Sequence, residues 1–328
     1  MIRYARESPV IGAGPVGLFQ SNYHTSPPWF RRFAVFSATN YLEGKNTNDL
    51  LPDSVHRFPM EVPVPDDPFA ELKAVQREAW ALFAPLEAIS TMPAAELIRH
   101  ALVRPQQSVL DVGCGTGVIA LTAARLGARA CGLDLARALI ERAKKNAALA
   151  DVEIDFREGD VEAMPYDNAS FDVVLSQFGH MFAPRPEVAI AEMLRVLKPG
   201  GTIAFSTWPP EHFVGQMAAL VGKYQPPPPG VASPLQWGEP SIVRQRLGET
   251  VADIVFDRGV LCFPALSPQH YRSGAEETFV PMVKLVQTLQ DDATRLAAFR
   301  AELDGCIASH LEDNMVRQHY LMTRAIKR

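Results

Sequence analysis

Three glycines at alternating positions, Gly113, Gly115 and Gly117, stand where backbone groups could bind a ligand. They follow the apolar run Val109–Val112 and precede a helical pattern, so the sequence predicts a strand, a turn and a helix N-terminus. Backbone N–H groups in such a turn approach a ligand closely, because glycine places no side chain in the way. An acid, Asp111, stands two residues before the first glycine.

A second acid, Asp134, ends the next apolar run, Ala130–Leu133. It comes about 20 residues after the first glycine, where a Rossmann-type unit places the carboxylate that holds ribose hydroxyls. The two acids and the turn therefore predict a nucleoside-bearing cofactor. A nicotinamide site would favour glycine at position 118, where this chain has Val118.

Strands and helices are expected to alternate between residues 108 and 207. The expected strands are Val109–Val112, Ala130–Leu133, Ile154–Arg157, Phe171–Ser176 and Thr202–Thr207, and the expected helices are Val118–Leu126, Ala136–Leu149 and Glu187–Leu197. Such alternation predicts an α/β fold with a doubly wound, Rossmann-like and mostly parallel sheet, with ligands at the carboxyl ends of its strands.

Segments on both sides of this region complete the expected organisation. Helical patterns at about 68–83 and 93–102 lead into the first strand. Helices at Glu276–Leu289 and Ala293–Leu311 are expected between two late strands, of which the last is antiparallel, and so form a cap. We expect three parts: a poorly structured extension over 1–59, N-terminal helices plus the cofactor-binding core over 60–210, and a substrate cap with the final strands over 211–328.

A second glycine pattern, Gly12-Ala13-Gly14-Pro15-Val16-Gly17, matches the dinucleotide form G-x-G-x-x-G. Its context argues against a flavin or nicotinamide site. The preceding apolar run is short, Pro27 and Pro28 soon interrupt the expected helix, and no acid follows at the ribose distance.

Composition narrows the class of protein. The chain has 328 residues, 47% of them hydrophobic, and a net charge of −5 without a long basic run, so nucleic-acid binding is not expected. Four scattered cysteines without a CxxC pair argue against a zinc site or a disulfide framework, and favour a reducing, cytoplasmic location. No apolar run has the roughly 18–20 residues of a membrane span.

The glycine turn with its acid, Asp111-Val112-Gly113-Cys114-Gly115-Thr116-Gly117, resembles the class I S-adenosylmethionine-dependent methyltransferases. Further segments match at the expected intervals: Leu133-Asp134-Leu135, Glu158–Tyr166, Phe171–Val174 and Leu194–Gly201. The resemblance covers about residues 68–208. More loosely, the remainder is similar to bacterial methyltransferases of the quinone- and natural-product-modifying type.

The resemblance implies S-adenosyl-L-methionine as cofactor and a role for each matched residue. The turn of Gly113, Cys114, Gly115, Thr116 and Gly117 would pass the methionine portion, with Asp111 near its ammonium. Asp134 would accept both ribose hydroxyls, and Leu135 would pack on the adenine. Asp160 would accept from the adenine amino group while the Val161 N–H donates to the ring. Gln177 would lie beside the sulfonium.

Methyl transfer displaces a sulfonium leaving group in one step, so the enzyme mainly aligns the reactants and excludes water. A general base is needed only where the nucleophile must lose a proton. His180 is the best-placed candidate, ahead of His212, His270 and Tyr271 in the cap, although a packing role is the more common fate of a lone histidine. Phe178, Met181, Phe182 and Trp208 are candidates for the substrate pocket. No metal is expected.

The predicted function is methyl transfer to an O, C or N atom of a small, partly apolar molecule. No Asn/Asp-Pro-Pro-Tyr/Phe motif follows the fourth strand, which argues against adenine in DNA as the acceptor. Two alternatives remain at this point: an NAD(P)-dependent oxidoreductase, and a non-catalytic S-adenosylmethionine-binding homologue.

Overall fold

The computed structural model describes residues 67–328. The expected N-terminal extension, 1–59, and the glycine pattern Gly12–Gly17 lie outside the described residues.

The sheet has eight strands in the order β3-β2-β1-β4-β5-β8-β6, with β7 paired to β8. The strands are β1 (Ser108–Val112), β2 (Arg129–Asp134), β3 (Asp155–Glu158), β4 (Phe171–Gln177), β5 (Leu197–Thr207), β6 (Val251–Pro264), β7 (Leu311–Glu312) and β8 (Met315–Lys327). The first five are parallel. β8 is antiparallel to both β5 and β6, so the expected mostly parallel, Rossmann-like sheet with an antiparallel last strand is confirmed.

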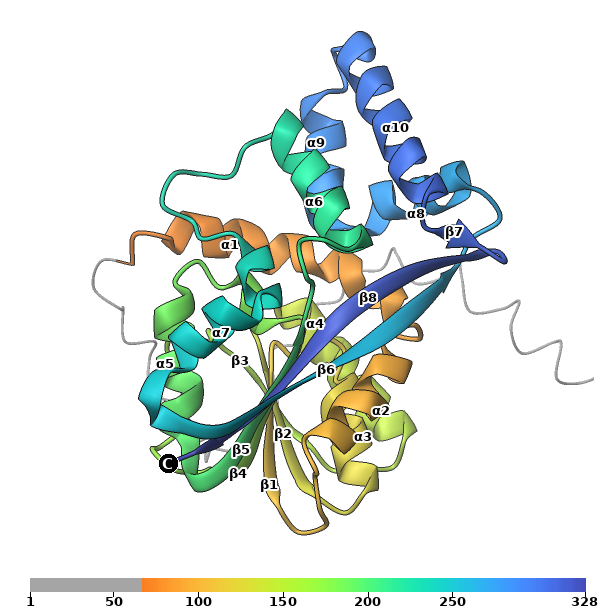
Figure 1. Cartoon of the computed structure of the whole chain (residues 1–328). Helices are drawn as coiled ribbons and strands as arrows, with labels where there is room; N and C mark the ends of the chain where they lie inside the picture. Colours follow the sequence, from red (N-terminus) through yellow and green to blue (C-terminus); the bar gives the residue numbers. More distant parts are fainter. Residues whose placement is uncertain (1–66) are drawn as a thin grey trace, which may run out of the picture. The chain divides into compact units, whose positions relative to one another are not determined.

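Helices cover both faces of the sheet (Figure 1). One apolar layer holds α2 (Thr91–His100), α3 (Val118–Arg125) and α4 (Arg137–Leu149) against the sheet. The other holds α5 (Pro186–Val196) and α7 (Pro240–Leu247). Strand β4 between them is almost wholly buried, as its continuous apolar sequence predicts.

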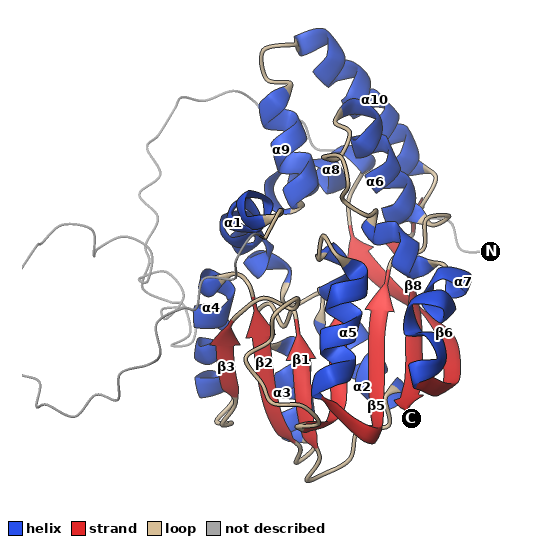
Figure 2. Cartoon of the chain, turned by 90° about the vertical axis from the view of Figure 1, so that its left-hand side faces the viewer, coloured by secondary structure: helices blue, strands red, loops and turns tan. Residues whose placement is uncertain are grey.

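Four helices form the cap: α6 (Phe213–Tyr224), α8 (Pro268–Thr278), α9 (Val280–Thr288) and α10 (Ala293–Ala308). They bury an apolar cluster of their own, centred on Phe213, Met282, Phe299 and Leu303. Figure 2 shows the parallel strands pointing toward these helices. The carboxyl ends of the strands therefore face the cap.

The first described helices also lie on this side. α1 (Ala70–Ala79) continues into the 3-10 helix η2 (Trp80–Leu86), and both run beneath the cap (Figure 1). The sequence predicts one helix over 68–83. The change to the tighter winding begins at Trp80, five residues before Pro85, which cannot donate a backbone hydrogen bond.

Three expected elements differ from the structure by more than two residues. The expected helix Ala293–Leu311 ends at Ala308, and Leu311 belongs to β7. The expected helix Glu276–Leu289 is wrong: α8 ends at Thr278 and α9 begins at Val280, because Pro281 favours the first turn of a new helix. The expected strand Thr202–Thr207 is longer in the structure: β5 begins at Leu197, which pairs with Phe171 before the register shifts.

Among the described residues, no single helix has the length and apolar character to span a membrane, and one pair bent by 99°, Ala70–Leu86 with Thr91–His100, meets those criteria only when taken together.

Candidate functional site

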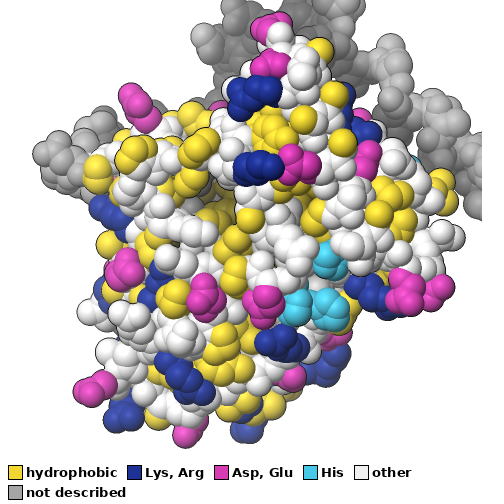
Figure 3. Space-filling view, turned by 45° about the horizontal axis from the view of Figure 1, so that its top comes forward, with side chains coloured by type: hydrophobic (Ala, Val, Ile, Leu, Met, Phe, Trp, Pro, Cys, Tyr) yellow, Lys and Arg dark blue, Asp and Glu magenta, His cyan; other side chains and the backbone are white. Residues whose placement is uncertain are grey.

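A central cavity lies between the carboxyl ends of the strands and the cap, and encloses about 240 Å³. Pockets that bury a drug-sized ligand typically enclose roughly 300–1,000 Å³, so this cavity is slightly smaller than such pockets. In Figure 3, hydrophobic side chains border a hollow, and basic and acidic side chains are interspersed over this face.

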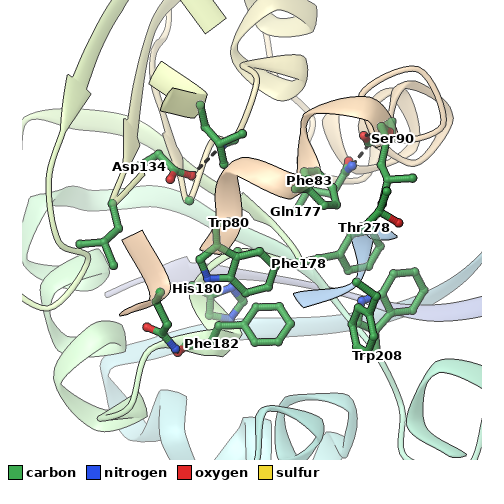
Figure 4. A pocket seen from close by; sticks show the side chains of 18 of the residues that line it. Trp80, Phe83, Ser90, Asp134, Gln177, Phe178, His180, Phe182, Trp208 and Thr278 are labelled. Atoms are coloured by element: carbon green, nitrogen blue, oxygen red, sulfur yellow. Dashed lines mark hydrogen bonds between the residues drawn. The ribbon is translucent and has the colours of Figure 1, made fainter. Parts of the chain in front are cut away.

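The cavity has two ends. The loop end is made by residues at or just after the carboxyl ends of β1, β2 and β3: Gly113, Gly115, Asp134, Leu135, Asp160 and Val161. The cap end is made by lining residues that come after β5: Trp208, Val214, Met217, Leu261, Phe263, Tyr271, Ala275, Thr278, Phe279 and Gln318. Figure 4 shows Asp134 on one side and Trp208 on the other.

At the loop end, the glycine turn leaves its backbone open toward the cavity at one position. Gly115 has a φ of +53°, and a Cβ there would meet only the ring of Phe83, at 4.0 Å. Gly117 differs, since a Cβ there would lie 2.7 Å from the Phe156 ring inside the core. Gly115 is therefore open to a ligand, whereas Gly117 is required by packing.

Asp134, the last residue of β2, holds the turn in place. Its two oxygens accept hydrogen bonds from the N–H groups of Gly115 and Ala136, each at 2.8 Å. Burial raises the pKa of Asp134, while these N–H donors oppose the rise. Each carboxylate oxygen still has a lone pair for a further donor. Asp134 lines the cavity and is 9% exposed, so its carboxylate can accept hydrogen bonds from the hydroxyl groups of a ligand.

Five predicted site residues do not line the cavity. Asp111 is 1% exposed, and its Oδ2 accepts from the Ala120 N–H at 3.2 Å behind the turn. Burial raises the pKa of Asp111 to about 8; the Ala120 N–H opposes this and the Asp134 charge adds to it. Three others belong to the turn, and Met181 packs in the apolar layer that holds α5 and α7. Those three are Cys114, Thr116 and Gly117.

Asp160 takes part in a charge cluster that the sequence did not predict. The ammonium of Lys73, on α1, lies 2.7 Å from Asp160 Oδ2, 2.6 Å from Asp67 and 2.5 Å from Glu162. Arg185 also contacts the buried Glu162, at 2.7 Å. Burial alone would lower the pKa of Lys73, but its bonds to the three carboxylates outweigh this and raise it. The three carboxylates lie close enough together to hold a cation, and Lys73 supplies that charge here. No motif or spacing in the sequence identifies Lys73 as a partner of Asp160.

Between the two ends lie Gln177 and His180 (Figure 4). Gln177 donates from Nε2 to the Ser90 carbonyl at 3.0 Å, and its buried Oε1 has no partner among the described residues. The His180 ring is 1% exposed, packs near Phe205 and Trp237, and has no described partner at either nitrogen. Burial, and secondarily the charge of Arg246, lower the pKa of His180 to about 3.

Aromatic rings line the middle of the cavity. Phe178 stacks on Trp208 with ring centroids 3.9 Å apart, and Trp80 packs against Phe182 at 4.7 Å. Phe178, Phe182 and Trp208 were predicted for a substrate pocket, and all three line the cavity. Trp80 belongs to η2, so the N-terminal helices contribute to the same wall.

Several known proteins are similar to this chain. Residues 110–205 match the family described as "Methyltransferase domain". An uncharacterized protein of Mycobacterium tuberculosis is 31% identical over 256 residues, which is 76% of this chain and 93% of that protein. A ubiquinone biosynthesis O-methyltransferase of Hahella chejuensis is 29% identical over 65% of this chain and 90% of its own length. A putative methyltransferase from Bacillus halodurans of known structure is 19% identical, with a TM-score of 0.49 over 71% of this chain and 98% of its own.

Proposed function

Because this chain belongs to the class I S-adenosylmethionine-dependent methyltransferases, we propose that it transfers a methyl group to an oxygen, carbon or nitrogen atom of a small, largely apolar molecule. The family uses S-adenosyl-L-methionine, which supplies an electrophilic methyl group on a sulfonium. The observation that carries the proposal is that Asp134 at the loop end and Trp208 at the cap end line one continuous cavity.

The loop end has the donors and acceptors that this cofactor needs. In the proposal, the spare lone pairs of Asp134 accept the ribose hydroxyls, and Leu135 packs on the adenine. Asp160 accepts a hydrogen bond from the adenine amino group while it keeps its ion pair with Lys73. The Val161 N–H donates to the adenine ring. Charge-assisted bonds of this kind are among the stronger hydrogen bonds in proteins.

The methionine portion would follow the open backbone at Gly115. The Oε1 of Gln177 has no donor among the described residues, and a buried acceptor without a donor is costly. A ligand that places a polar or positively charged group beside this oxygen would remove that cost. Asp111 lies behind the turn, and so would act on the ammonium through the backbone or through water.

The chain's part in the transfer is alignment and the exclusion of water. The aromatic wall of Trp80, Phe178, Phe182 and Trp208 presents an apolar surface to the acceptor molecule. An acceptor held in line with the methyl group needs little further catalysis. We assign no proton-transfer step to His180, since a ring with a pKa of about 3 is a weak proton acceptor at neutral pH. Its predicted catalytic role stays a prediction, as does the cytoplasmic location.

Two measurements test the proposal. In titration calorimetry, S-adenosylhomocysteine should bind with micromolar affinity, and NAD should not bind. Incubation of the protein with a metabolite extract and methyl-labelled S-adenosylmethionine should then place the label in a small molecule that organic solvent extracts. Binding without any labelled product would instead favour a non-catalytic homologue, and NAD binding alone would contradict the proposal.

A further inference from the structure

The cap end of the cavity contains one polar pair in an apolar surrounding. Tyr271 on α8 and Gln318 on β8 both line the cavity and are 7% and 5% exposed. Gln318 Nε2 donates to the Tyr271 hydroxyl oxygen at 2.9 Å. The two residues come from different elements, so the fold itself brings them together.

This pair has hydrogen-bond donors to spare. The amide of Gln318 carries two N–H groups and the phenol of Tyr271 carries one O–H, and the bond between them uses one of the three. The Tyr271 O–H donates to no acceptor in the described residues. If the Gln318 amide is turned over, the Tyr271 O–H donates to its oxygen and the amide N–H groups become free. In either arrangement the pair keeps a donor that has no acceptor among the described residues, and in the first arrangement the Oε1 of Gln318 also has no donor there.

The pair stays neutral. Burial raises the pKa of Tyr271, the nearby Cys306 adds to the rise, and the bond from Gln318 only partly offsets it. The phenol therefore keeps its proton over the physiological range and acts as a donor. Every cavity-lining residue of the cap end is uncharged, and the remaining hydroxyl there, on Thr278, already donates to the Gly274 carbonyl at 2.8 Å.

We propose that Tyr271 and Gln318 select the acceptor molecule by binding a neutral carbonyl oxygen carried on an otherwise apolar frame, an inference that rests on the proposed methyl transfer. A buried donor without an acceptor costs stability, and a ligand oxygen removes that cost. A carboxylate would also accept these bonds. However, it would be buried at an end of the cavity that has no cation, and an unpaired buried charge is far more costly than a neutral polar group. A ketone, ester or amide oxygen fits both conditions.

Three probes of one shape test the pair. The ketone 2-acetylnaphthalene, the hydrocarbon 2-ethylnaphthalene and the carboxylate 2-naphthoate share an apolar frame and differ in the group presented to Tyr271. Their dissociation constants are measured by equilibrium dialysis against the full-length protein, with and without S-adenosylhomocysteine. The wild-type protein should bind the ketone more tightly than either of the other probes.

The substitutions Tyr271→Phe and Gln318→Met keep the volume of the side chain, and each leaves the donor of the other residue, so the variant that carries both is needed to remove every donor of the pair. This double variant should lower the preference for the ketone over the hydrocarbon by about 2- to 10-fold, the range expected for one neutral hydrogen bond. The matched control is Thr278→Val, which removes a cavity hydroxyl whose donor is already used. It should leave the preference unchanged.

The proposal is overturned if the wild-type protein prefers 2-naphthoate, shows no preference for the ketone, or binds none of the probes. It is also overturned if the double variant, shown to be folded by thermal melting, retains the wild-type preference. The wild-type comparison stands even if a variant does not fold. If the wild-type protein does not bind S-adenosylhomocysteine, the proposed function is contradicted. The test of Tyr271 and Gln318 stays separate, because the probes are also measured without that ligand.

Discussion

The two ends of the central cavity are built by different means. At the loop end, binding groups come from the backbone of one turn and from acids that end neighbouring strands, such as Asp134, whose oxygens hold the Gly115 and Ala136 amides. At the cap end, uncharged side chains from α6, α8, β6 and β8 meet across long sequence separations. The loop end is suited to one invariant polar ligand, whereas the cap end can change its ligand by changing single side chains.

A bulky side chain at Gly115 should have the largest effect, because it fills the loop end and leaves the cap end untouched. In Gly115→Val, S-adenosylhomocysteine binding should weaken by more than about 1,000-fold, or over about 4 kcal/mol. The φ of +53° adds a folding cost of roughly 1–2 kcal/mol, which the protein should survive. Calorimetry measures the first and thermal melting the second.

Gly117→Val is the comparison for that variant. Its Cβ would lie 2.7 Å from the Phe156 ring, so it should fail through loss of stability instead. If Gly115→Val bound S-adenosylhomocysteine normally, the glycine turn would not be the cofactor site.

Asp111 should give the loop end a dependence of stability on pH that the cap end lacks. Burial raises its pKa to about 8, against an ordinary value of 3.8. Between these values the folded protein holds a proton that the unfolded chain releases, so stability falls as pH rises from about 4 to 8, by at most about 1.4 kcal/mol per unit. Asp111→Asn should remove this decline. Urea unfolding at pH 5 and pH 8 measures the difference.

The exposed Asp291, near the start of α10 in the cap, provides the control. Asp291→Asn should keep the wild-type dependence of stability on pH. An equal decline in Asp111→Asn and the wild-type protein would mean that Asp111 is ionised throughout this range.

Removal of the Asp134 carboxylate should weaken S-adenosylhomocysteine binding by about 1.5–3 kcal/mol, because charge-assisted hydrogen bonds are lost. Calorimetry on Asp134→Ala measures this. Asp304→Ala removes a cap carboxylate that bonds Arg272 at 2.7 Å, and should leave the affinity unchanged. If both substitutions weakened S-adenosylhomocysteine binding equally, the cap would affect cofactor binding as much as the loop end does.

The smallest effect is expected at His180, which lies between the ends. With a pKa of about 3 it is neutral at every physiological pH. Turnover of the identified acceptor by His180→Leu should stay within about threefold of wild type, with a parallel pH profile, whereas loss of a general base costs about 100-fold or more. A drop of that size would restore His180 as a catalytic residue.

The loop end could be predicted from the sequence because its contacts are local. A glycine turn after a strand, with Asp134 one β-α unit later, places its groups by secondary structure alone. The positions of Asp134 and Gly115 on the cavity follow from that rule. That rule does not say which residues of the turn line the cavity. Cys114 and Thr116 are therefore expected there from the sequence, but they do not line it.

The cap end could not be predicted in this way. Tyr271 and Gln318 have no spacing that relates them, and the part of α8 that carries Tyr271 was missed because the expected helix begins at Glu276, whereas Ser267 caps a helix that begins at Pro268. Lys73 was missed for the same reason, since only the folded chain brings its helix to Asp160. Tertiary contacts of this kind leave no periodic pattern in one sequence.

Strand β8 runs without a break from the cap end to its pairing with β5, where Thr323 lies opposite Phe205. Side chains alternate between its two faces, so a shift of one residue exchanges one face for the other. A shift of the upper part of β8 by one residue would place His319 or Arg317 at the position of Gln318, and it would also displace the pairing of β8 with β6, in which Gln318 lies opposite Leu261. The register between β6 and β8 therefore fixes which polar side chain the cap end receives.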